Sequence, residues 1–206
     1  MNKHFTLILV ALLTLSATLQ AQNIEKRILR LNEHDATVVA QFTETHVHAK
    51  KKQTTKKEGD LYFKNPDALA LRYTTPQGDY SIIREDKFLV KQGAKKQGFV
   101  MNPKNPSKMF VLRNTLLYAL AGNVEAAAKA NNAKVKCEES ATRFVCKLTV
   151  KGNPTQGVTA LQLVYEKVEG HLLILRIDEA NGNRTTYELS NAVERQTIPE
   201  EVWSIE

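Results

Sequence analysis

Short segments in which apolar and polar residues alternate recur along most of the chain, and this pattern limits the possible folds more than any other feature. Alternation with a period of two is typical of strands that bury one face. Turn-forming residues stand between the segments at short intervals, as in an antiparallel sheet of hairpins. The predicted strands lie at residues 38–43, 60–63, 68–74, 80–83, 88–90, 134–138, 143–150, 161–165, 173–177 and 185–189, with turns that include 77–79, 85–87 and 181–183.

Helical patterns occur in three places, and one of them is unusually apolar. Ser107 after Pro106 is a good N-cap, and the segment that follows it predicts a helix ending at Gly122. A shorter helix is predicted over residues 124–130, and an amphipathic one over residues 23–35 with Asn23 as its cap. The apolar residues of the long helix are Met109, Phe110, Leu112, Leu116, Leu117 and Leu120.

These elements predict a mainly β (α+β) fold. A long sheet with so few helices cannot cover both of its faces, and the long helix needs a large apolar surface to pack on. The expected architecture is a strongly curved antiparallel sheet forming an incomplete barrel, with helices covering its concave hydrophobic side.

The first 21 residues have the pattern of a cleaved signal peptide. Lys3 and His4 precede an apolar run over residues 5–19, and Ala21 is a small residue suited to cleavage. No repeat and no linker follows, so residues 22–206 are expected to form a single domain. We therefore expect an exported, soluble, periplasmic protein.

The charge and the cysteines bear on partners and compartment. The formal net charge is +7, which favours an anionic lipid surface or an acidic protein partner, because export makes nucleic acid the least expected one. Cys137 and Cys146 lie in two predicted strands on either side of a tip at residues 139–142. In an oxidising compartment this placement predicts a disulfide; two thiols alone make no metal site.

The order of these features over most of the mature chain resembles the periplasmic outer-membrane lipoprotein carrier (LolA) family. A first helix leads to the strand Ala40-Gln41-Phe42-Thr43-Glu44. The segment from Gly59 to Pro66 resembles a "G-x-L-x-x-x-x-P" pattern of the family, and Tyr73 to Pro76 resembles its "Tyr-x-x-Pro". The closing hairpin contains a D-x-x-G-N-x-T turn at residues 178–185.

The resemblance implies a carrier whose cavity encloses the acyl chains of a lipoprotein and moves it from an inner-membrane release complex to an outer-membrane receptor. A monomer without a cofactor is expected. The residues predicted to line the cavity are Phe42, Phe63, Leu69, Leu71, Tyr73, Met109, Phe110, Leu112, Leu116, Leu117 and Leu120. Each of them also suits an ordinary hydrophobic core.

One position departs from the family pattern. Well-studied members have an arginine directly before the proline of this segment, where it latches the lid, and here that position is Asn65. A short neutral side chain cannot make a charge-assisted fork. Three explanations stay open: a looser lid, replacement of the latch by Lys64 or Arg72, or a different cargo.

Other interpretations of the chain remain. A lipid-sensing or stress-sensing regulatory protein on the same scaffold is the alternative function. His46 and His48 share one strand face, as metal ligands or as solvent-facing residues. The lysines between Lys50 and Lys57 form a hairpin tip that is either simply solvated or contacts an acidic partner or anionic lipid. No catalytic motif occurs, so an enzyme is not expected.

Overall fold

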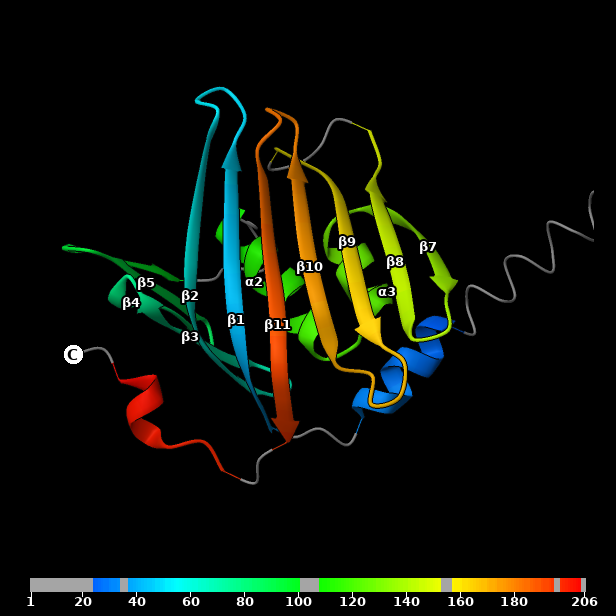
Figure 1. The fold of residues 1–206 in the computed structure, drawn as a ribbon, viewed down its shortest axis with the longest axis horizontal. Coiled ribbons are helices and arrows are strands. Elements are labelled where there is room, and N and C mark those ends of the chain that lie inside the picture. The colour runs from blue at the N-terminus through cyan, green and yellow to red at the C-terminus, as the bar shows by residue number, and fades with distance from the viewer. Residues whose placement is uncertain (1–23, 34–36, 101–107, 153–156, 195–196, 205–206) are drawn as a thin grey trace, which may run out of the picture.

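The computed structural model describes residues 24–33, 37–100, 108–152, 157–194 and 197–204, and within them eleven antiparallel strands form one open sheet. Strands that follow one another in sequence pair with one another in each half of the sheet, and β1 pairs with β11 where the halves meet (Figure 1). The strands are β1 (Thr37–His48), β2 (Gln53–Lys64), β3 (Ala68–Thr75), β4 (Gln77–Arg84), β5 (Lys87–Gln92), β6 (Lys95–Val100), β7 (Ala133–Glu139), β8 (Arg143–Val150), β9 (Val158–Glu166), β10 (Leu172–Glu179) and β11 (Arg184–Glu194).

The helices lie on the concave side of the sheet, as the sequence predicts. Helix α2 (Lys108–Leu120), helix α3 (Val124–Ala130) and the N-terminal helix (residues 24–32) are all behind the sheet in the view of Figure 1 or at its lower edge. Their buried residues share one core with the inner-facing side chains of the strands. The predicted mainly β fold, an incomplete barrel with helices covering its concave face, is confirmed.

Alternation along β1 sets the inner face of the sheet. Val38, Ala40 and Phe42 are buried in the core that the helices cover, whereas Gln41 is exposed. Gly59 on β2 pairs with Phe42 and lies so close to β3 that a Cβ there would overlap the Arg72 carbonyl oxygen. A glycine is therefore required where β2 and β3 meet at a bulge.

The two cysteines form the predicted disulfide. Cys137 on β7 and Cys146 on β8 are directly paired across the strands, and both are buried in the main core. The bond joins the edge strand β7 to the sheet.

Three predicted turns are shorter than expected. Strand β1 continues to His48 and β2 begins at Gln53, so Lys56 and Lys57 belong to β2 rather than to the tip. Gln77 begins β4 and Lys87 begins β5. Backbone pairing continues through these polar residues because ladder hydrogen bonds do not depend on apolar side chains.

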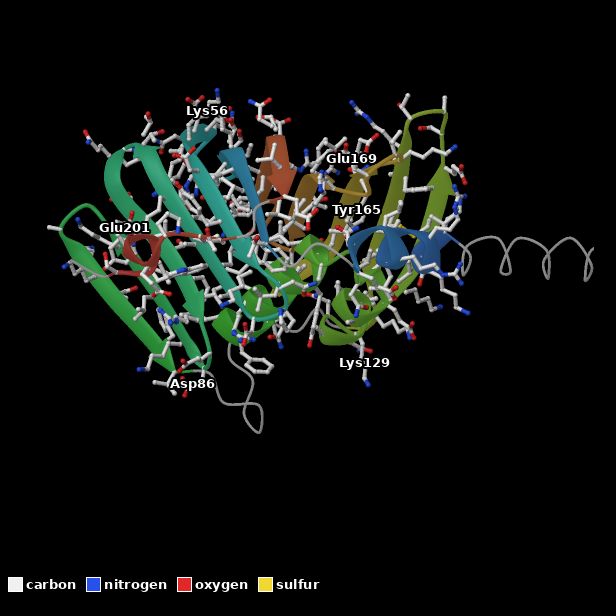
Figure 2. The ribbon with its side chains drawn as sticks, turned by 90° about the horizontal axis from the view of Figure 1, so that it is seen from below. Lys56, Asp86, Lys129, Tyr165, Glu169 and Glu201 are labelled. Atoms are coloured by element: carbon white, nitrogen blue, oxygen red, sulfur yellow. A yellow bond between two sulfur atoms is a disulfide. The ribbon has the colours of Figure 1, made fainter. Side chains whose placement is uncertain are left out.

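Two elements were missed. Strand β6 has a mostly polar, exposed sequence and pairs with β5 as an edge strand, so it lacks the alternation that would reveal it. A short 3-10 helix (Glu200–Trp203) covers the convex face, opposite α3, as the positions of Glu201 and Lys129 in Figure 2 show.

This C-terminal helix makes a second, smaller core on the convex face. Trp203 and Val202 pack against Ala68 and Ala70 of β3, with Tyr80 and Ile82 of β4. Arg72 extends from β3 to the same segment, and its guanidinium donates hydrogen bonds to the carbonyl oxygens of Val202 at 2.5 and 2.9 Å and of Ser204 at 2.5 Å. Strand β3 is therefore buried on both of its faces.

Some predictions concern residues outside the described ranges. These are the signal peptide at residues 1–21 and the caps Asn23 and Ser107. In the described part of the chain, no helix is long and apolar enough to cross a membrane.

Candidate functional site

A small, wholly apolar cavity lies between α2 and the concave face of the sheet. Its volume is about 10 Å³, which is roughly the space of one water molecule. Both halves of the sheet contribute to its wall. It is lined by Phe42, Leu61, Leu69, Leu71, Leu116, Leu120, Leu172, Leu175, Tyr187 and Leu189.

A larger pocket of about 220 Å³ continues toward the first half of α2. Its floor is apolar, with Met109, Leu112, Leu161 and Ile177 among its lining residues. Polar groups from Thr115, Asn131, Glu179 and Thr185 also line it. Tyr187 lines both spaces, so the closed cavity and the pocket are neighbours on the same face of the sheet.

The two halves of α2 differ in their burial. Leu116, Leu117 and Leu120 in the second half are almost completely buried, whereas Met109 and Leu112 in the first half are half-buried. The hydroxyl of the buried Tyr165 donates a hydrogen bond of 2.9 Å to the Ala119 carbonyl oxygen. This contact fixes the second half of α2 to β9.

Arg113 joins the middle of α2 to the half of the sheet that contains β4 and β5. Its guanidinium donates a hydrogen bond of 2.6 Å to the carbonyl oxygen of Glu85, in the turn between β4 and β5, and one of 2.9 Å to Asn114. The Nε atom of Arg113 is buried without a hydrogen-bond partner among the described residues. Arg113 therefore holds α2 over the sheet, although one N–H group of its guanidinium has no hydrogen-bond partner in the described structure.

Polar residues of the concave face lie beside the apolar cavity. The Tyr73 ring packs edge to face on Phe42, with centroids 5.1 Å apart, and its hydroxyl donates a 2.5 Å hydrogen bond to Glu44. Burial raises the pKa of Tyr73 far above its ordinary value, and nearby Tyr187 and Glu44 raise it further. Tyr73 therefore stays neutral and acts as a hydrogen-bond donor at any physiological pH.

A comparison with protein families decides the relationship. The model of the family described as "Outer membrane lipoprotein carrier protein LolA" matches residues 33–206. The chain belongs to this family. No curated protein matches it.

Solved structures with a similar fold share little sequence with the chain. An uncharacterized conserved protein from Thermus thermophilus has a TM-score of 0.52 and 8% identity, covering 91% of this chain and 94% of that one. At this identity it supports the fold alone. A LolA superfamily protein from Nitrosomonas europaea gives a TM-score of 0.44 at 11% identity, covering 90% and 97%. The Pseudomonas aeruginosa MucA/MucB complex gives 0.49 at 9%, covering 89% and 61%.

The structure brings the predicted LolA cavity residues into one core but not into one wall. Phe42, Leu69, Leu71, Leu116 and Leu120 line the closed cavity, and Met109 and Leu112 line the pocket. Phe63, Tyr73, Phe110 and Leu117 belong to the surrounding core. Whether these residues contact a ligand stays a prediction.

Residues from the second half of the sheet were missed as lining residues. Leu161, Leu175, Ile177, Tyr187 and Leu189 alternate in the sequence, but their distance along the chain from β1 to β3 hides the shared cavity. Alternation along the predicted strand over residues 173–177 would place Leu173 on the same face as Leu175 and Ile177. A register shift between Leu172 and Ile174 places Leu172 on the inner wall instead.

The two residues proposed as substitutes for the LolA latch, Lys64 and Arg72, make no hydrogen bond to α2 in the described part of the chain. Arg72 is engaged with the C-terminal segment on the convex face, and Lys64 is exposed at the end of β2. The half-buried Asn65 side chain makes no hydrogen bond within the described ranges. Arg113 was not predicted from the sequence, but its hydrogen bond to the Glu85 carbonyl oxygen joins helix and sheet as a latch would. Here the arginine belongs to the helix, whereas the family arginine before the proline would belong to the sheet.

The two histidines lie on the concave face near the tip of β1. His46 Nδ1 is 2.8 Å from the Thr185 hydroxyl, and the His46 and His48 ring centroids are 4.1 Å apart. Among the described residues, no three side chains of the kinds that bind metals are grouped. The contacts of His46 and His48 are therefore those of ordinary strand residues beside the pocket-lining Thr185.

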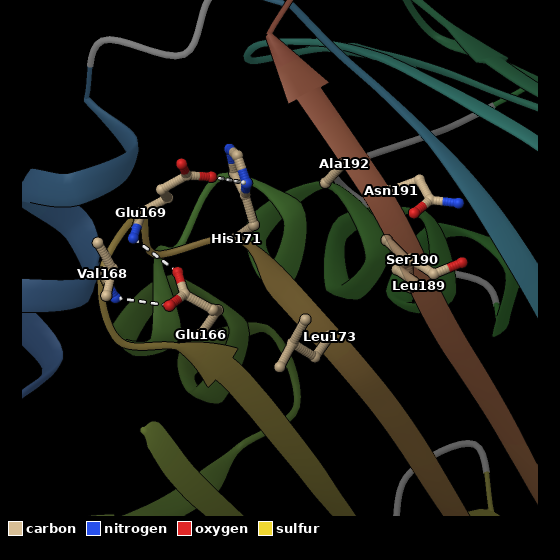
Figure 3. A pocket seen from close by; sticks show the side chains of 9 residues that line it. All are labelled: Glu166, Val168, Glu169, His171, Leu173, Leu189, Ser190, Asn191 and Ala192. Carbon is tan, nitrogen blue, oxygen red and sulfur yellow. Dashed lines mark hydrogen bonds and ion pairs between the residues drawn. The ribbon is translucent and has the colours of Figure 1, made fainter. Parts of the chain in front are cut away.

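An open hollow of about 450 Å³ lies between the β9–β10 turn and the end of β11 (Figure 3). The Glu166 carboxylate accepts hydrogen bonds from the backbone N–H groups of Val168 and Glu169, which fold the turn itself. His171 Nδ1 is 3.4 Å from the Glu169 carboxylate. These carboxylates serve the turn, so we assign no site to this hollow.

Proposed function

We propose that the chain is a periplasmic carrier that binds the acyl chains of lipoproteins between α2 and the concave face of the sheet. In this proposal it takes them from an inner-membrane release complex to an outer-membrane receptor. The observation that carries the proposal is the wholly apolar cavity that lies beside an amphipathic pocket under a half-buried helix. Membership of the LolA family supports the same function.

The apolar lining matches the energetic need of an acyl chain. A chain of sixteen carbons in water costs on the order of 12 kcal/mol, at about 0.8 kcal/mol for each methylene. The cavity wall offers leucine, phenylalanine and tyrosine side chains. The hydroxyl, amide and carboxyl groups at the edge of the pocket suit the polar part of such a ligand.

Binding requires α2 to move, because the two spaces together are smaller than the roughly 300–1,000 Å³ of typical ligand pockets. The second half of α2 is fixed by the core and by Tyr165. The first half is half-buried, and the Arg113 contact ties the middle of the helix to the turn at Glu85. Displacement of the first half would join the pocket to the closed cavity and admit the chain.

The experiment combines ligand detection with transfer. The mature chain from Gln22 is purified gently, bound acyl material is identified by native mass spectrometry and organic extraction, and lipoprotein transfer between membranes is then measured. Leu112→Glu places a carboxylate in the pocket at a half-buried position. Val100→Glu, at a 74% exposed position on the edge strand β6, is the matched control.

A carrier binds acyl chains, delivers them to outer membranes, and loses both abilities in Leu112→Glu but not in Val100→Glu. Binding without delivery would replace the carrier by the lipid-sensing or stress-sensing regulatory protein. A chain that neither contains nor accepts acyl material would contradict both.

A further inference from the structure

Unpaired lysines gather at one end of the sheet. Lys50, Lys51 and Lys52 are exposed in or beside the turn between β1 and β2, and Lys95 and Lys96 are exposed beside the turn between β5 and β6. These turns lie at the same end, because β1 and β5 run in the same direction in the antiparallel sheet. None of the five makes an ion pair within the described ranges.

Three carboxylates near this end are neutralised by basic side chains, whereas Glu179 beside the turn between β10 and β11 makes no ion pair within the described ranges. Asp79, whose side chain is 5% exposed, is 3.5 Å from the Lys57 ammonium, and Lys56 pairs with Glu58 at 2.6 Å. Asp178 accepts hydrogen bonds from the guanidinium groups of Arg184 and Arg176. The charge presented to solvent by these two turns is therefore positive.

The turns at the other end carry charges of both signs. Asp67 lies between β2 and β3, Glu85 and Asp86 between β4 and β5, and Glu166 and Glu169 at the turn between β9 and β10. Lys64, Arg84, Lys87 and Lys167 lie beside these carboxylates, so charges of both signs are interspersed at this end, whereas the lysines of the two turns at the basic end are clustered. An electric asymmetry of this kind orients a protein at a charged surface.

The basic end is also the end where the pocket lies. The pocket is lined by Glu179 and Thr185, on either side of the turn between β10 and β11. That turn touches the lysine tip, since Asn183 accepts a 3.1 Å hydrogen bond from the Ala49 backbone N–H. Figure 1 shows the β1–β2 and β10–β11 turns side by side at the top of the sheet.

We propose that the Lys50–Lys52 tip docks on an anionic phospholipid surface and presents the pocket to the bilayer. The inference rests on the proposed function for its purpose, since an acyl carrier must bring its pocket to a membrane. The composition of the tip favours lipid over protein. Protein interfaces are depleted in lysine and enriched in aromatic residues and arginine, whereas clustered lysines bind anionic lipid headgroups as mobile point charges.

The test measures binding of the mature chain to vesicles of phosphatidylcholine with and without phosphatidylglycerol, by co-sedimentation. The tip variant carries Lys50→Gln, Lys51→Gln and Lys52→Gln. The matched control carries Lys26→Gln, Lys64→Gln and Lys87→Gln, which remove the same charge from exposed positions away from this tip. Empty vesicles contain no cargo, so failure of acyl-chain carriage would not by itself affect this result.

We expect binding that requires phosphatidylglycerol and weakens as ionic strength rises. Each lysine near the surface contributes about fivefold, so the tip variant should lose on the order of a hundredfold in partition coefficient. The control should keep most of the binding. Equal losses in both variants would show attraction by net charge alone and overturn the proposal. Unchanged vesicle binding by the tip variant would also overturn it, and an acidic protein partner would take the place of the membrane.

Discussion

Strand β3 is covered on both sides, and its two covers differ in kind. On the concave side α2 lies over the large side chains of Leu69 and Leu71 and leaves a cavity. On the convex side the C-terminal helix lies over Ala68 and Ala70, and Trp203 fills the space above these small residues. The leucines under the partly buried α2 leave a space that movement of the helix can enlarge. The alanines under Trp203 instead pack closely against its indole.

The attachments of the two covers differ in the same way. Arg72 donates hydrogen bonds to several carbonyl oxygens of the C-terminal segment, and its guanidinium lies 5.1 Å from the centre of the Tyr80 ring. Arg113 donates one hydrogen bond to the turn at Glu85 and leaves its Nε without a partner in the described structure. We infer that the convex cover is structural and the concave cover is able to open.

The largest expected effect is on the convex cover. Trp203→Ala removes the side chain that fills the space over Ala68 and Ala70, and should lower the free energy of unfolding by about 3–5 kcal/mol. Acyl-chain binding by the protein that remains folded should not change. Urea unfolding and ligand titration measure the two quantities, and weakened binding by folded Trp203→Ala would show that the covers are not independent.

A smaller loss is expected at the arginine of the same cover. Arg72→Ala should lower the free energy of unfolding by about 1.5–3 kcal/mol, because hydrogen bonds from a charged group to the C-terminal carbonyls are lost. Arg72→Lys keeps the charge without the planar fork and should restore part of this. Thermal unfolding should show that Arg72→Lys is more stable than Arg72→Ala. Equal stabilities of the two variants would show that the planar geometry of the guanidinium is not needed.

Removal of the corresponding arginine in α2 should have a different result. Arg113→Ala should lower the free energy of unfolding by about 1 kcal/mol or less, because relief of the unpartnered Nε offsets the lost hydrogen bond. Uptake of an acyl chain should become faster, since α2 is released from the turn at Glu85. Stopped-flow fluorescence with a labelled fatty acid measures this rate, and slower uptake would contradict the latch.

The smallest effect concerns the N-terminal helix, a further cover of the concave side. Glu139 forms an ion pair with Lys167 and accepts a 2.6 Å hydrogen bond from Arg27. The hydrogen bond from Lys167 and, after it, the one from Arg27 lower the pKa of the Glu139 carboxyl group below the ordinary 4.5. The stabilisation is therefore complete above pH 4.5 and is lost as the pH falls through the lowered value. Thermal unfolding across this range should show a shallower loss in Glu139→Gln, and identical pH profiles would refute the coupling.

The sequence predicts one cover better than the other for a physical reason. Alternation in β1 and the apolar length of α2 reveal the concave core, because both patterns are strong and local. The C-terminal helix is only four residues long, and Trp203 finds its partners on β3 far along the chain. Alanines on the outer face of β3 give no sign that they are covered.

The site shows the same limit. Leucines of β3 and α2 were predicted from their own patterns, but the wall formed by β9, β10 and β11 depends on how the sheet curves. The bulge that selects Leu172 over Leu173 and the reach of Arg113 to Glu85 are three-dimensional features with no local signature.

The most direct test of the account asks on which side of β3 an acyl chain binds. A fatty acid with a nitroxide on its chain is added to methyl-labelled protein, and the loss of each methyl NMR signal is measured. The account predicts that signals from Leu69, Leu71 and Leu116 disappear, whereas those from Ala68 and Ala70 under Trp203 remain. Loss of the alanine signals with retention of the leucine signals would place the ligand on the convex side and contradict the account.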